Sequence, residues 1–113
     1  MSNSTTRFAN VNARKSVWWF DIPVEKFTSD KYDMLDLLMV SAYAKELHHL
    51  RVQTAYVRDN LCHFQVREDI GSVSLELSSL STNKFQDVRP RSGKMLLSQL
   101  VVKTLALTRY NQL

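Results

Sequence analysis

Residues 34–44 read MLDLLMVSAYA, and this stretch decides which fold the sequence predicts. Only Asp36 and Ser41 interrupt its apolar side chains, so the segment is suited to burial on more than one side. Residues 28–30, just before it, are Thr, Ser and Asp, which favour helix N-caps because their side chains accept hydrogen bonds from free backbone N–H groups. The sequence therefore predicts a helix over residues 30–50.

A second apolar stretch lies near the C-terminus, where residues 95–107 read MLLSQLVVKTLAL. Ser92 precedes it as a possible cap, which predicts a final helix over residues 93–110. A helix that is apolar nearly all round must be covered on more than one side. In a chain of 113 residues, we expect a second copy or a partner to supply part of that cover.

Short segments between and before these helices have the composition of strands. Residues 16–22 (SVWWFDI) are dense in aromatic and β-branched side chains. Residues 54–58 and 61–67 flank an Asp-Asn pair, which predicts a β-hairpin with a tight turn. Residues 72–79 (SVSLELSS) alternate, so their Val and Leu side chains should point inward and their Ser and Glu side chains into water.

The predicted order is therefore β-α-β-β-β-α. This order indicates an α+β two-layer sandwich, in which two helices pack on one face of an antiparallel four-stranded sheet. Residues 1–15 are rich in Ser, Thr and Asn without periodicity, which predicts a mobile N-terminal arm. Residues 16–113 should form a single domain.

Composition bounds the class of protein. Cys62 is the only cysteine, so the chain can form no internal disulfide, which suits a reducing compartment. No apolar stretch has the length of a signal peptide core or a membrane span, so we expect a soluble cytoplasmic protein without a membrane partner.

The net charge of +4 is unevenly distributed along the chain. Residues 1–15 carry +3, residues 16–83 carry −4 and residues 84–113 carry +5. Basic ends around an acidic middle suit a polyanion partner such as nucleic acid, and they equally suit self-association between oppositely charged surfaces.

The segment RPRSGKM at residues 89–95 is the candidate anion site. Arg89, Arg91 and Lys94 would surround the start of the predicted last helix, where free N–H groups and the helix dipole attract phosphate. The segment is no nucleoside triphosphate loop, because Met95 stands where a Ser or Thr would hold magnesium.

Candidate metal ligands and nucleophiles do not converge in the predicted elements. His48 and His49 are adjacent on a predicted helix and would point about 100° apart. Cys62 and His63 are adjacent on a predicted strand and would point to opposite faces, with Cys62 in the core. We therefore expect no metal, no cofactor and no catalytic residues.

The leading hypothesis is a small non-enzymatic domain that acts by association, as a homodimer or as a protein-interaction module. Its candidate interface residues are the apolar side chains Trp18, Trp19, Leu38, Met39 and Tyr43. One alternative is nucleic-acid binding through the basic N-terminal arm and the 89–94 loop. A second is a small-molecule pocket between the sheet and the helices.

Overall fold

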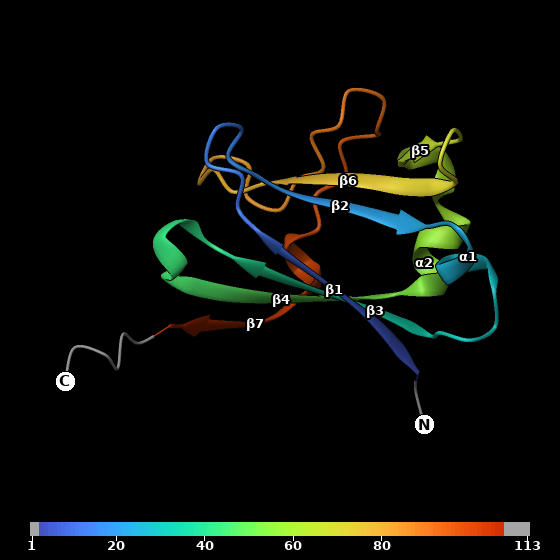
Figure 1. The fold of residues 1–113 in the computed structure, drawn as a ribbon, viewed down its shortest axis with the longest axis horizontal. Coiled ribbons are helices and arrows are strands. Elements are labelled where there is room, and N and C mark those ends of the chain that lie inside the picture. The colour runs from blue at the N-terminus through green and yellow to red at the C-terminus, as the bar shows by residue number, and fades with distance from the viewer. Residues whose placement is uncertain (1–2, 108–113) are drawn as a thin grey trace.

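Residues 34–44 form a strand and a turn rather than a helix. The computed structural model describes residues 3–107, and its elements are labelled in Figure 1. In chain order they are β1 (Ser4–Asn10), β2 (Val17–Pro23), α1 (Glu25–Thr28), β3 (Met34–Val40), η1 (Ala42–Ala44), β4 (Glu46–Gln53), α2 (Thr54–Asp59), η2 (Leu61–His63), β5 (Gln65–Arg67), β6 (Ser72–Ser78), η3 (Ser98–Leu100) and β7 (Val101–Ala106).

The strands form two sheets, so the predicted single antiparallel sheet covered by two helices is wrong. Sheet A has the order β1-β3-β4-β7 and is mixed, because β1 runs parallel to β3. Sheet B has the order β2-β6-β5 and is antiparallel. The helices α1 and α2 are short and lie together at one end of the two sheets, on the right of Figure 1.

The hydrophobic core lies between the two sheets. The Trp18 indole Nε1–H on β2 donates a hydrogen bond to the Val40 carbonyl on β3 at 2.9 Å, which joins the sheets directly. The buried side chains that form the core come from both sheets, both helices and the C-terminal segments: Trp18, Phe20, Ile22, Phe27, Leu35, Leu37, Met39, Leu50, Val52, Val57, Phe64, Val73, Leu75, Leu77, Phe85 and Leu97.

The two predicted helices are strands for different reasons. β3 is an interior strand between β1 and β4, and such a strand carries a nearly continuous apolar run that resembles a buried helix. In the last apolar stretch, the β-branched residues Val101, Val102 and Thr104 lie in β7 instead. Residues 108–110 of the predicted last helix lie outside the described residues.

The other segments divide between confirmed and wrong predictions. The predicted strands 16–22 and 72–79 are confirmed as β2 and β6. The predicted hairpin over residues 54–67 is wrong, because its first strand is α2 and its second begins as η2 and becomes β5. Residues 4–10 of the predicted mobile arm form the edge strand β1.

Candidate functional site

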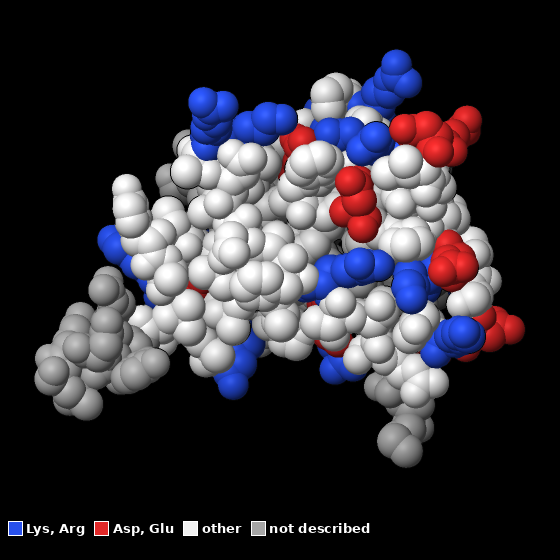
Figure 2. Space-filling view, viewed as in Figure 1, with Lys and Arg blue, Asp and Glu red and all other residues white. Residues whose placement is uncertain are grey.

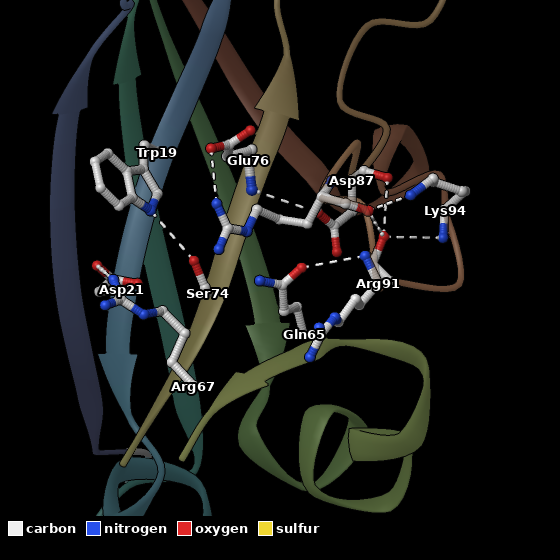
Figure 3. Close-up of polar contacts among 11 residues, drawn as sticks. Trp19, Asp21, Gln65, Arg67, Ser74, Glu76, Asp87, Arg91 and Lys94 are labelled. Atoms are coloured by element: carbon white, nitrogen blue, oxygen red, sulfur yellow. Dashed lines mark hydrogen bonds and ion pairs between the residues drawn. The ribbon is translucent and has the colours of Figure 1, made fainter. Parts of the chain in front are cut away.

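The outer face of sheet B, which points away from the core, is polar and yet covered. Ser72, Ser74, Glu76 and Ser78 point outward from β6 as the alternation predicts, but all four are buried rather than in water. The side chain of Trp19 lies over this face and donates its Nε1–H to Ser74 Oγ at 3.2 Å (Figure 3).

The segment over residues 86–94 begins along the edge of β6, where the fully buried Asp87 forms an antiparallel bridge with Leu77. The Oδ1 atom of Asp87 accepts hydrogen bonds from the backbone N–H groups of Glu76 and Arg89, both at 3.3 Å. Its Oδ2 atom has no hydrogen-bond partner within residues 3–107. Burial raises the pKa of this carboxyl, because removing it from water disfavours the charged form.

Two of the three predicted phosphate contacts are occupied internally. The guanidinium of Arg89 pairs with the Glu76 carboxylate at 3.0 Å, and both side chains are largely buried. The Lys94 ammonium donates to the Arg89 backbone carbonyl. Arg91 is exposed, and only its backbone N–H is held, by Gln65 Oε1 at 3.1 Å.

The predicted helix that would have supplied free N–H groups at residue 93 does not form, whereas phosphate binding by Arg89, Arg91 and Lys94 stays a prediction. A hollow of about 370 Å³ beside Arg91 is lined by Gln65, Val66, Arg67, Glu68, Asp69 and Arg91. Arg67 is itself paired with Asp69 at 3.2 Å and with Asp21 at 3.7 Å. Carboxylates therefore neutralise Arg67 and Arg89. The contacts of Arg89 with Glu76 and of Arg91 with Gln65 hold the 86–94 segment against sheet B (Figure 3).

The outer face of sheet A carries an apolar patch among polar side chains, and this patch consists of Phe8, Leu38, Val40, Leu47 and Leu105. Strand register aligns Phe8, Leu38 and His49 in one row across β1, β3 and β4, with Lys103 beyond them on β7. The next row is Asn10, Val40, Leu47 and Leu105. Phe8 is 59% exposed and Leu105 is 41% exposed, and no described helix or strand lies over this face in Figure 1.

A charge cluster lies on the same outer face of sheet A. Asp36 Oδ1 is 2.7 Å from His49 Nε2 and 3.5 Å from Arg51 Nε. A carboxylate beside a histidine can serve acid–base chemistry, provided that a reacting group lies within reach. The hydroxyl in register with Asp36 belongs to Thr6, and no hydrogen bond joins Thr6 to His49. The cluster therefore neutralises Asp36 within the face.

The five predicted interface residues do not form one surface. Trp18 and Met39 are buried in the core and cannot contact a partner in this fold. Trp19, 48% exposed, lies on sheet B, whereas Leu38 lies on the outer face of sheet A. Tyr43 lies in the turn between β3 and β4. Phe8 was not among the predicted residues, because residues 1–15 were expected to form a mobile arm, although Thr and Phe there suit a strand.

The histidines and the cysteine also differ from their predicted places. His48 is buried in an edge-to-face contact with Trp18 and Phe85, and burial lowers its pKa, as Lys84 does to a lesser degree. Cys62 was predicted in the core, and it is exposed in η2 because this segment forms a 3-10 turn rather than a strand. Within residues 3–107, no group of three His, Cys, Asp or Glu side chains could hold a metal ion.

The predicted pocket between a sheet and two overlying helices has no counterpart here. The helices lie at one end of the sheets, and core side chains fill the space between the sheets. The two largest of the hollows found, of about 410 and 430 Å³, are open to the surface. None of the helices that the structure describes is long and apolar enough to cross a membrane.

No family model, no curated protein and no solved structure matches this chain.

Proposed function

We propose that this protein is a small non-enzymatic association module that forms a homodimer through the outer face of sheet A. The observation that carries the proposal is the contrast between the two outer faces. The outward serine and glutamate side chains of β6 are buried within the chain itself, whereas the apolar patch on the outer face of sheet A is left open. Covering such a face releases about 25 cal/mol for each Å² of apolar surface removed from water.

The charges on this face support a second copy as the occupant. Arg51 compensates Asp36 at the centre, and the remaining formal charge is Lys103 on the edge strand β7. A two-fold interface places the same patch of both copies together, so an uncompensated charge at its centre would be repelled by the same charge of the other copy. This face avoids that repulsion.

The size of the face sets the expected strength of the dimer. Four strands about 4.8 Å apart, which average seven residues with a rise of about 3.3 Å each, cover roughly 19 by 23 Å. That area is at the low end for specific protein interfaces, so we expect a dissociation constant in the micromolar range.

Sedimentation velocity between about 1 and 200 µM protein, a range that brackets the expected micromolar constant, tests the proposal. The wild-type chain should shift from monomer to dimer, and Phe8→Asp and Leu105→Asp should each remain monomeric. Ile70→Asp is the matched control, since Ile70 is similarly exposed but lies in the turn before β6.

Circular dichroism of each variant separates a lost interface from a lost fold, and two variants on different strands guard against one that fails to fold. A wild-type chain that stays monomeric over the whole range would overturn the proposal. Equal dimerisation of Phe8→Asp, Leu105→Asp and Ile70→Asp would overturn it as well.

A further inference from the structure

Three loops meet at the end of the sandwich opposite the helices, and we call this region the loop end. The loops comprise residues 11–16, 41–45 and 79–84, at the left of Figure 1. The Ser79 backbone N–H and hydroxyl both donate to the Ser16 carbonyl at 2.8 Å, and the Val11 N–H donates to the Val40 carbonyl at 3.0 Å. Hydrogen bonds therefore connect segments far apart in the sequence.

The loop end is basic, because its three loops contain no acidic residue and Glu46, which follows the second loop, is the one carboxylate in the walls of its hollows. Its cations are Arg14 and Lys15 in the first loop, Lys45 in the second and Lys84 in the third. None of these four makes an ion pair among residues 3–107. In Figure 2, acidic side chains gather instead over the right-hand end, where the helices lie. The cations of the loop end are therefore available to an anionic partner.

An aromatic side chain stands among these cations. Tyr43 is 86% exposed and has a φ of 60°, in the left-handed region that favours glycine. Ala44 shares this conformation with a φ of 52°. A left-handed backbone in a non-glycine residue costs on the order of 1 kcal/mol. The turn is therefore strained, and in it the Tyr43 ring is exposed to solvent.

Two hollows have Tyr43 in their walls. One of about 430 Å³ lies between Tyr43 and residues 10–16. The other, of about 340 Å³, has Lys45, Lys84 and one carboxylate, Glu46, in its wall together with Tyr43. Volumes above about 300 Å³ are those of small-ligand sites, so each hollow has room for a nucleobase beside the ring.

We propose that the loop end binds single-stranded nucleic acid, with phosphates on Arg14, Lys15, Lys45 and Lys84 and a base stacked on Tyr43. Cations that follow a backbone and an aromatic ring that stacks a base are the two components of single-strand binding. The site favours single strands because a base inside a duplex has no free face for Tyr43. It differs from the 89–94 loop, where Arg89 and Lys94 are engaged internally.

Fluorescence anisotropy tests the proposal, using a labelled mixed-sequence DNA oligonucleotide, the RNA of the same sequence and the corresponding DNA duplex. Both single strands should bind more tightly than the duplex. Log affinity should fall with log salt with a slope near −0.7 per phosphate contact, and therefore about −2.8 for four contacts.

Two variants separate the contributions of charge and stacking. Lys45→Gln with Lys84→Gln should reduce the magnitude of the slope by about 1.4, because two phosphate contacts are lost. Tyr43→Ala should weaken binding by about 5-fold or more with an unchanged slope, whereas Tyr43→Phe should retain it. Arg91→Gln with Lys94→Gln is the charge-matched control and should leave the slope unchanged.

Absence of salt-sensitive binding at low salt would overturn the proposal, and so would a slope that falls with the Arg91 and Lys94 variant instead. The protein could instead self-associate at low salt without binding oligonucleotides, and only the Lys45 and Lys84 variant could abolish this. That result would overturn the proposal and mean that the loop end binds the helix end of another copy. The monomeric Phe8→Asp variant should still bind the oligonucleotides, which keeps this test separate from the dimer.

Discussion

Asp87 is an ionisable residue in a fully buried environment. Its carboxyl is fully buried, has one oxygen without a partner among the described residues and lies beside the ion pair of Arg89 with Glu76. The two backbone N–H groups that it accepts come from β6 and from the 86–94 segment. Asp87 therefore fastens a long irregular segment to a sheet through backbone hydrogen bonds that need an oxygen but not a charge.

We predict that Asp87→Asn is at least as stable as the wild type near neutral pH. The raised pKa means that the folded chain keeps this proton at a pH where the unfolded chain has lost it. The contribution of Asp87 to stability is therefore fully present below its ordinary pKa of 3.8 and declines as pH rises through the folded value. An asparagine stays neutral and can still accept both N–H bonds, so the variant should gain on the wild type as pH rises.

Urea unfolding of both proteins at about pH 4 and about pH 7 measures this difference, with Asp30→Asn as the exposed control. A variant that is equally destabilised at both pH values would contradict the prediction. That result would mean that Asp87 is needed for its shape or for a charge interaction with Arg89.

At the scale of elements, the burial of β3 was predicted correctly and its secondary structure was not. The apolar composition of residues 34–40 predicts burial, and β3 is indeed largely buried. Composition does not specify the element, because a short apolar run suits an interior strand as well as a helix. The turn has Tyr43 and Ala44 where glycine or asparagine would have indicated a hairpin.

We predict that Ala44→Gly stabilises the protein by roughly 0.5–1 kcal/mol, because glycine adopts a positive φ without the steric cost that alanine carries. The matched control is Ala42→Gly in the same turn, where φ is not positive and glycine adds only chain entropy to the unfolded state. Chemical denaturation should therefore shift in opposite directions for the two variants. A loss of stability in both would show that the left-handed turn carries no relievable strain.

At the scale of the whole molecule, β1 decides whether sheet A has three strands or four. It pairs with β3 along its whole length, and the neighbouring residues Ala9 and Val11 pack against the core. Removing residues 1–10 should therefore cost several kcal/mol of a total stability of about 5–15 kcal/mol.

Thermal and urea unfolding of the shortened chain measure that cost, and removal of residues 1–2 alone serves as the control. A mobile arm, as the sequence predicts, would leave stability unchanged in both. An unchanged melting temperature after removal of residues 1–10 would therefore contradict the strand assignment of β1.

The distribution of charge is also a property of the whole molecule. Along the sequence, Arg14 and Lys15 belong to one basic end and Lys84 to the other, separated by an acidic middle. The fold brings all three into the loop end and adds Lys45 from that middle. The acidic residues collect at the opposite end instead, so charge blocks along the chain did not predict the charged surfaces.

The sequence by itself determined which side chains share a face in β2 and β6. The two-residue period is a local property of extended backbone, so Trp18 and Phe20 oppose Trp19, and Val73, Leu75 and Leu77 oppose the serines. Only the tertiary structure decided that residues 34–40 are a strand, that the serine face is covered and that the outer face of sheet A is open. Those outcomes depend on which distant segments pack together, and burial of apolar surface between them outweighs the local preference of any one segment.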